Sequence, residues 1–313
     1  MITETGTTSG NNDTNLASRI LMTLHIADRR GYGLCLFHLS KILVCGEVTS
    51  ETVLGELRNL PGISQRNGIY CLKGREQVLT KTSERLKCHN KHAKAYEAVA
   101  RRFASEYVSR CPFIKCIAVA GSMASGGFTE KDDIDFNIYV EKGSKYTVYF
   151  VGLLLSIKYS FLYRKKPLAE CSKTPFLPKL ICINVIWEDT EVFPYVRQDE
   201  YLAYELLRQK PIFGLEFYRE VLSGNIWLKT CFPQIYNLEA DEIKTKRTLS
   251  GRILRLFYSN PAISMIGEGL CKRISTFLWR LVQFSRRNNP QAIERVRWVT
   301  AMQKPYTLFS EKI

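Results

Sequence analysis

Two groups of residues in one apolar stretch have types and spacing suited to phosphate chemistry. Residues 113–140 read FIKCIAVAGSMASGGFTEKDDIDFNIYV, with the pair Gly121-Ser122 followed, after a gap of ten residues, by Asp133 and Asp135. In a strand, the two-residue period places both carboxylates on one face and their apolar neighbours on the other. Adjacent carboxylates repel each other and lose hydration unless a cation lies between them. Such oxygen ligands suit Mg²⁺ that carries the phosphates of a nucleotide.

Apolar runs and turns surround these residues and predict the strands that position them. Ile114–Ala120 has the β-branched content of a buried strand, and the Gly-Ser pair after it is suited to a turn into a helix. Asp133–Val140 is predicted as a second strand and Leu180–Trp187 as a third. The apolar run that begins at Tyr146 contains Lys158, so we predict a helix packed on the sheet and not a membrane span.

The Gly-Ser turn, the gap and the paired acids resemble the signature of the nucleotidyltransferase superfamily that includes DNA polymerase beta. The resemblance implies that Gly121 and Ser122 contact a nucleoside triphosphate, and that Asp133 and Asp135 bind metal, with Mg²⁺ as the cofactor. It also implies an α+β fold in which residues 111–215 form the nucleotidyltransferase core, a mixed sheet with flanking helices.

The third predicted strand departs from that family's pattern. The superfamily usually carries a third carboxylate there, which binds metal and helps to deprotonate the attacking hydroxyl, whereas this chain has Asn184. An amide can bind a metal or position a nucleophile, but it is too weak a base to take a proton. Glu188 lies on the same predicted face and could substitute, so both are candidate catalytic residues. The acids that fit this role less well are Asp189, Glu130 and Asp132.

The segment after this strand resembles a poorly characterised bacterial and archaeal subgroup of these proteins. In that subgroup a winged-helix-like part precedes the transferase core, and Asn at the position of Asn184 is familiar; the resemblance spans about residues 15–235. A predicted helix near residue 200 leaves Tyr204, Arg208 and Lys210 able to face the nucleotide. Arg208 and Lys210 are therefore predicted nucleotide-binding residues.

The N-terminal part is predicted to be a small winged-helix-like domain, residues 15–77. Helical spacing appears in Asn15–Arg29, Leu36–Val44 and Thr49–Leu60, and Asn67-Gly68 is a hairpin signal between short apolar strands. DNA binding and protein contact both remain open for it, because fold alone does not assign function. Residues 78–110 are predicted to be a connecting helix.

Composition sets limits on partners and setting. The chain has 313 residues, with 45 Lys and Arg against 30 acids, a formal charge of +15. This favours polyanions: a nucleoside triphosphate, nucleic acid on the basic surface, or an anionic membrane. The ten cysteines include no Cys-x-x-Cys pair, which predicts free thiols and a cytoplasmic setting. Residues 1–14 resemble neither a signal peptide nor an anchor and are predicted to be disordered.

Residues 216–313 are predicted to form a basic, helical C-terminal subdomain. One segment has an apolar face that runs from Ile263 to Leu281, and Glu268, Lys272 and Arg273 within it exclude a membrane span. We favour a subdomain that covers the active-site cleft. A helix that lies on a membrane or grips an acceptor is the alternative.

The sequence therefore predicts a magnesium-dependent nucleotidyltransferase. It would move a nucleoside monophosphate from an NTP to a hydroxyl acceptor and release pyrophosphate, with ATP as the default donor because ATP is abundant. The acceptor is open: a small molecule, a protein side chain or an RNA end. Two alternatives are a DNA-binding regulator whose weakened core senses nucleotides, and a membrane-peripheral binding module.

Overall fold

The computed structural model describes residues 15–130, 132–163 and 180–309, which form an α+β protein. The chain divides between Thr82 and Ser83 into two units, each with its own sheet. The predicted tail, residues 1–14, lies outside the described residues. Among those described, none of the helices combines the length and the apolar character that crossing a membrane requires.

The first unit is built from three helices and a small antiparallel sheet with strand order β1-β3-β2. In chain order its elements are α1 (Leu16–Arg29), β1 (Leu34–Cys35), α2 (Leu36–Lys41), α3 (Ser50–Leu57), β2 (Ile63–Arg66) and β3 (Ile69–Leu72). The side chains of Asn15 and Thr49 cap α1 and α3 by accepting a backbone hydrogen bond. Asn67 and Gly68 both have positive φ, as a two-residue hairpin turn requires.

The predicted helices and hairpin of this unit are confirmed with small changes of boundary. Strand β1 was not predicted, because a strand of two residues is too short to show an alternation of apolar and polar side chains. It pairs with β3, where Leu34 lies opposite Tyr70. Helix α4 (Gln77–Arg110) begins in this unit and continues into the second, so the predicted connecting helix is one unbroken helix.

The second unit contains a four-stranded mixed sheet with strand order β6-β5-β4-β7. Besides α4, its elements are β4 (Ile114–Val119), α5 (Gly121–Ala124), β5 (Ile134–Val140), α6 (Lys145–Leu162), β6 (Ile181–Glu188), α7 (Glu200–Arg208), β7 (Lys210–Phe213), α8 (Leu215–Ser223), α9 (Trp227–Cys231), α10 (Leu249–Tyr258), α11 (Pro261–Arg286) and α12 (Pro290–Gln303), with short 3₁₀ helices at Asp189–Glu191 and Pro233–Tyr236. β5 pairs with β4 antiparallel and with β6 parallel. The parallel pair needs a crossover connection, which contains α6.

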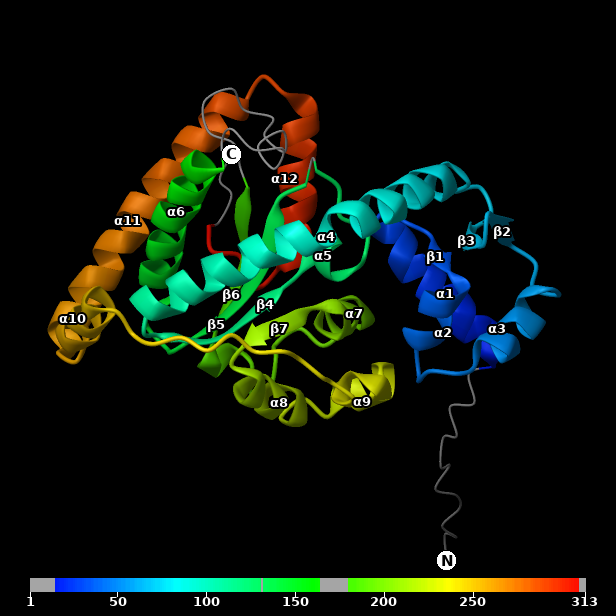
Figure 1. Cartoon of the computed structure of the whole chain (residues 1–313), viewed down its shortest axis with the longest axis horizontal. Coiled ribbons are helices and arrows are strands. Elements are labelled where there is room, and N and C mark those ends of the chain that lie inside the picture. The colour runs from blue at the N-terminus through cyan, green and yellow to red at the C-terminus, as the bar shows by residue number, and fades with distance from the viewer. Residues whose placement is uncertain (1–14, 131, 164–179, 310–313) are drawn as a thin grey trace, which may run out of the picture. The chain divides into compact units, whose positions relative to one another are not determined.

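Helices cover both faces of this sheet (Figure 1). On one face, Phe103 of α4 and Tyr159 of α6 join Phe136 of β5 in the main hydrophobic core. On the other face, Tyr139 of β5 lies against Tyr218 of α8. The core-facing residues of β5 alternate with residues that face α7 and α8, so the strand presents two different surfaces.

The C-terminal helices are tied to the sheet layers within the same unit. α11 packs on α6, and Glu268 of α11 accepts hydrogen bonds from the backbone N–H groups of Tyr146 and Thr147, at 2.6 and 2.9 Å. A carboxylate at the first turn of α6 satisfies N–H groups that the helix itself cannot. Since Ser83 and the residues after it form one unit, the predicted division after residue 215 does not separate two compact parts.

Candidate active site

Two aspartates and a cysteine lie together where β5 and β6 begin. Asp133 immediately precedes β5, and Asp135 is its second residue. Cys182 is the register partner of Asp135 on β6. Ligand atoms of these three residues lie within 4.8 Å of one another. We call this group the acid cluster.

The Gly-Ser turn lies directly against the acid cluster. The backbone N–H of Ala120 donates a hydrogen bond to the carbonyl oxygen of Asp135 at 2.8 Å. Gly121 has φ +60°, and a Cβ added there would lie 2.1 Å from Oδ2 of Asp135. Both the left-handed backbone and the contact with the carboxylate therefore require glycine at this position.

Asp132 ties the loop between the two motifs together and does not belong to the acid cluster. Its Oδ2 accepts from Arg85 Nη2 at 2.5 Å, from the Thr129 N–H at 2.9 Å and from the Ser122 hydroxyl at 3.2 Å. Glu130, the neighbouring acid, pairs with Nε2 of His92 at 2.7 Å. These two acids fix the loop that carries the Gly-Ser turn to the acid pair.

Two predicted nucleotide-binding cations lie near this turn. Lys210 of β7 is the register partner of Val119 on β4, which lies two residues before Gly121. Arg208 donates a hydrogen bond from Nη2 to the carbonyl oxygen of Ser125 at 2.6 Å. Nε of Arg208 is buried and meets no hydrogen-bond acceptor among the residues that the structure describes. Although the Lys210 side chain is exposed, desolvation by the surrounding protein and then the charge of Arg208 lower its pKa.

His89 of α4 lies near Lys210. Burial and then the charge of Lys210 lower its pKa. Its Nδ1 accepts a hydrogen bond from the backbone N–H of Phe128 at 3.3 Å, which requires that nitrogen to be unprotonated. Tyr204, by contrast, does not face a ligand: it is fully buried with its ring near that of Phe232.

Asn184 lies deeper along the same face than the acid cluster, in a polar network. The register of β6 shifts by one residue there, because Phe136 pairs with Ile183 and Asn137 with Val185. Nδ2 of Asn184 donates to Oδ1 of Asn137 at 2.8 Å. Its Oδ1 accepts from Nε2 of Gln303, the last residue of α12, at 2.9 Å. Both ends of the amide therefore make protein contacts.

Glu205 of α7 is a carboxylate on this face that sequence reasoning missed. Its Oε1 lies 3.4 Å from Nδ2 of Asn184 and equally far from Nδ2 of Asn137, which is two residues after Asp135. Residues i and i+2 of a strand share a face and are roughly 7 Å apart. Cys182 was missed too, since a cysteine in an apolar strand looks like core. Only the register places it opposite Asp135.

Glu188 lies at the opposite end of the sheet, so the structure does not bring it to the acid cluster. Its register partner on β5 is Val140, which lies five residues beyond Asp135. Five residues correspond to roughly 16 Å along the strand. Its carboxylate accepts from the Gly143 N–H at 3.0 Å, and its N–H donates to Glu191 at 2.8 Å. Burial raises the pKa of Glu188. Glu188 therefore stabilises the turn at Gly143 through this hydrogen bond.

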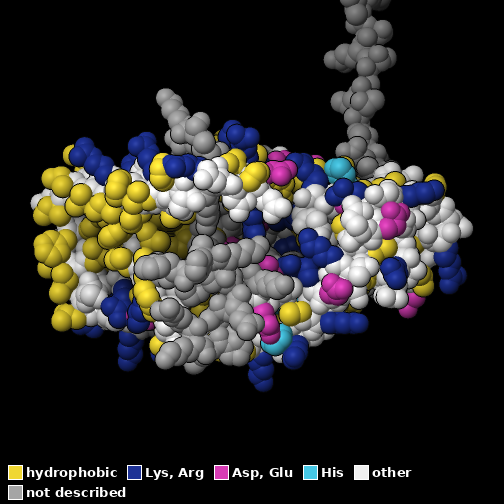
Figure 2. Space-filling model, turned by 90° about the horizontal axis from the view of Figure 1, so that it is seen from above, with side chains coloured by type: hydrophobic (Ala, Val, Ile, Leu, Met, Phe, Trp, Pro, Cys, Tyr) yellow, Lys and Arg dark blue, Asp and Glu magenta, His cyan; other side chains and the backbone are white. Residues whose placement is uncertain are grey.

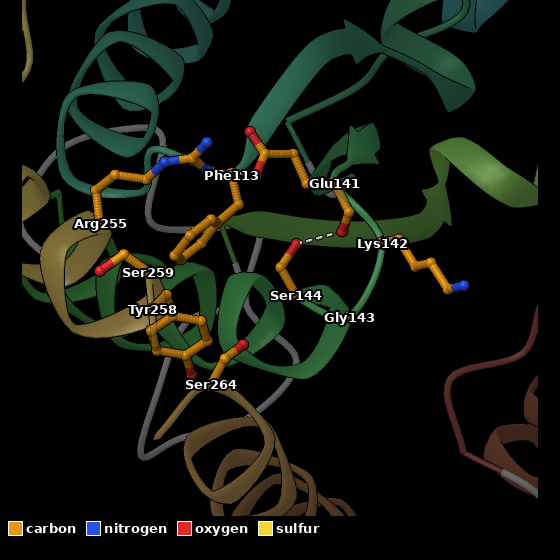
Figure 3. A pocket seen from close by; sticks show the side chains of 9 residues that line it. All are labelled: Phe113, Glu141, Lys142, Gly143, Ser144, Arg255, Tyr258, Ser259 and Ser264. Carbon is orange, nitrogen blue, oxygen red and sulfur yellow. Dashed lines mark hydrogen bonds and ion pairs between the residues drawn. The ribbon is translucent and has the colours of Figure 1, made fainter. Parts of the chain in front are cut away.

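A cavity of about 240 Å³ also lies at this far end (Figure 3). It is lined by Phe113, Glu141, Lys142, Gly143, Ser144, Arg255, Tyr258, Ser259 and Ser264. Within it Arg255 pairs with Glu141, and the Ser144 hydroxyl donates to the Glu141 carbonyl oxygen at 2.6 Å. These groups satisfy one another, and the cavity is separate from the acid cluster.

Comparison with known proteins identifies no relative of this chain. No protein-family model, no curated protein and no solved structure matches it. The chemistry of the site must therefore be argued from its own residues.

The acid cluster has the ligand types for a divalent cation. The carboxylates of Asp133 and Asp135 are the oxygen ligands that Mg²⁺ takes from proteins when substrate phosphates supply the rest. The Cys182 thiol is a softer ligand that suits zinc or copper better. With only one such group, the set fits a cation held by two aspartates more closely than a four-ligand zinc site.

Proposed function

We propose that this protein is a magnesium-dependent nucleotidyltransferase, and that the contact between Gly121 and Asp135 supports this most strongly. The sequence motif predicts that the Gly-Ser turn and the acid pair bind the same metal-nucleotide ligand. In the fold, a backbone turn with no room for a side chain lies against the carboxylate of the pair. This arrangement can place the phosphates of a nucleotide next to a metal bound by the acids.

In this proposal each group has one task. Asp133 and Asp135 hold Mg²⁺, which when bound would neutralise charge on the transferring α-phosphoryl group and on pyrophosphate. Gly121 and Ser122 contact the triphosphate, for which the Ser122 hydroxyl exchanges its bond to Asp132 for one to phosphate. Arg208 and Lys210 add positive charge beside the turn. ATP is the donor that we would test first.

We assign the proton-accepting role to Glu205, in place of Asn184 or Glu188. The acceptor hydroxyl oxygen attacks the α-phosphorus, the bond from that phosphorus to the bridging oxygen breaks, and pyrophosphate leaves. The hydroxyl proton passes to the Glu205 carboxylate. Asn184 is a positioning residue, because its amide links Asn137, Glu205 and Gln303.

The test is transfer of label from each α-³²P nucleoside triphosphate in the presence of Mg²⁺ and a cell extract, which supplies small-molecule, protein and RNA acceptors. We expect label in an acceptor with the wild-type chain and none with Asp133→Asn or Asp135→Asn. A matched control is Asp189→Asn, an aspartate at the far end of the sheet. Label transfer that persists in both acid-pair variants would refute the proposal.

The alternative is a DNA-binding regulator whose core binds nucleotide without turnover. Two observations favour it: the third strand carries Asn184, and the first unit has the order α-β-α-α-β-β with a three-stranded antiparallel sheet, as expected for a winged-helix-like domain. Nucleotide binding without label transfer, together with salt-dependent binding to duplex DNA that Arg66→Gln abolishes, would support the regulator. Arg66 is exposed at the end of β2, beside the hairpin turn.

A further inference from the structure

Helix α11 exposes a continuous row of apolar side chains. Ile263, Leu270, Phe277 and Phe284 recur every seven residues and therefore follow one line along the helix. Each is exposed, with Phe277 at 60% and Phe284 at 63%. The helix has 26 residues and is about 39 Å long, so this row spans most of its length.

Neighbouring residues widen the row into a face. On α11 the exposed apolar side chains beside it are Ile266, Ile274 and Leu281, and on α10 they are Leu249, Ile253, Leu256 and Phe257. Figure 2 shows yellow side chains gathered over the end of the molecule that holds these helices. Solvent-exposed apolar surface of this extent marks an interaction site in soluble proteins. We call it the α10–α11 face.

A row of arginines runs beside the apolar row. Arg273, Arg280 and Arg287 also recur every seven residues, and each follows an apolar residue of the row by three positions. Residues three apart are neighbours on a helix surface, so the two rows are adjacent. The guanidinium carbon of Arg287 lies 3.7 Å from the ring centroid of Phe284, which shows this directly.

The two helices that carry this face are basic. Residues 249–287 contain seven Lys and Arg and one acid, Glu268. Glu268 is engaged with the first turn of α6. The α10–α11 face therefore presents apolar side chains and positive charge together.

We propose that the α10–α11 face docks on an anionic membrane surface. The apolar row enters the boundary between headgroups and acyl chains, and the arginine row lies at the level of the headgroup phosphates. A second copy of the chain fits this face less well, because pairing two such faces would bring like charges together. An acidic protein partner shares the charge complementarity, and the experiment distinguishes it.

The test is flotation of the full chain with vesicles of phosphatidylcholine alone or of phosphatidylcholine with phosphatidylserine. We expect binding to the phosphatidylserine vesicles only. Arg273→Gln/Arg280→Gln/Arg287→Gln should weaken it on the order of a hundredfold, since each surface cation contributes about fivefold. Leu270→Gln/Phe277→Gln should weaken it at least about tenfold. Glutamine favours helix and all five positions are exposed, so circular dichroism should be unchanged.

A matched control removes the same number of charges from another helix. Lys87→Gln/Lys91→Gln/Lys94→Gln changes exposed positions on α4 and should bind vesicles as the wild type does. Failure to float, equal binding to both vesicle types, or equal weakening by the control would overturn the proposal. It would also be overturned if the chain is a dimer that Leu270→Gln/Phe277→Gln dissociates, or if it binds polyglutamate but neither vesicle.

Discussion

The two ends of the parallel strand pair β5–β6 both carry acidic residues, but their surroundings differ. At the far end, Asp189 accepts from Lys115 Nζ at 2.6 Å and from the Lys142 N–H at 3.1 Å, and Glu191 accepts from Lys145 at 2.8 Å. At the near end, Asp133 and Asp135 lie within 4.8 Å of each other and of a thiol. The far-end acids pair with lysines of the fold, whereas the near-end acids lie beside each other and beside Cys182.

This difference separates structural acids from acids that suit a ligand. An aspartate with a lysine and a backbone N–H as partners gains stability by being charged. Two adjacent aspartates instead disfavour one another's charge, and a bound cation removes that penalty. The near end also has the turn at Gly121, where Asp135 leaves no room for a side chain.

The largest expected effect comes from removing one charge at each end. Asp135→Asn should lower label transfer about 10³-fold, because a metal-held charge contributes several kcal/mol to the transition state. Asp189→Asn should keep activity and lose up to about 1 kcal/mol of stability, as its ion pair with Lys115 is broken. Transfer assays measure the activity of both variants, and urea unfolding measures the stability of Asp189→Asn. Transfer that is lost in Asp189→Asn but kept in Asp135→Asn would contradict the comparison.

Glu205 tests whether the near end holds a proton acceptor as well as a metal site. Glu205→Gln should lower the transfer rate by about 10²-fold or more while Mg²⁺-nucleotide binding is kept, because only the base is lost. Glu200→Gln, at the start of the same helix, is the matched control. If Glu205→Gln transfers label at the wild-type rate, another group accepts the proton.

Two glycines with positive φ, Gly143 at the far end and Gly121 at the near end, allow the cost of a left-handed backbone to be measured apart from the effect of contact with Asp135. Gly143→Ala should cost about 1–2 kcal/mol of stability, since its added Cβ meets no atom of the described residues within 4 Å. Gly121→Ala adds a collision with Asp135, so we expect about 2–3 kcal/mol in total and about tenfold weaker Mg²⁺-nucleotide binding. Chemical denaturation measures the stability of the two variants, and calorimetry measures their Mg²⁺-nucleotide binding. Equal stability and equal binding in the two variants would show that contact with Asp135 has no effect.

The smallest effect concerns Glu188 and depends on pH. Because burial raises its pKa above the ordinary 4.5, the folded state holds the proton more tightly than the unfolded state. Wild-type stability should therefore fall, relative to Glu188→Gln, as pH rises from about 4.5 through the raised pKa. The variant keeps an oxygen that can accept from the Gly143 N–H, and its transfer activity should be unchanged. Loss of transfer in Glu188→Gln would place this residue in the reaction after all.

Sequence reasoning succeeded where the signal is local. The helices of the first unit, its hairpin at Asn67, and the strands around the acid pair have spacings that short windows reveal. β7 was missed because it is four residues long, contains Pro211 and lies at the sheet edge, where proline is tolerated.

The candidate site was only partly predictable, because strand period reports the face of a residue and not its position along the sheet. Glu188 was expected near the acids on period alone, and the register with β5 places it at the far end. Cys182 and Glu205 reach the near end through strand register and helix packing across a gap of about fifty or more residues. No short window of sequence contains that information.

The most direct test of the central claim is calorimetric titration of ATP with and without Mg²⁺, using the wild type, Asp133→Asn/Asp135→Asn, and Glu188→Gln/Asp189→Asn. We predict Mg²⁺-dependent binding to the wild type and to the far-end variant, and its loss in the acid-pair variant. Binding that is independent of Mg²⁺, or that survives in the acid-pair variant, would contradict the assignment of the near end as the metal-nucleotide site.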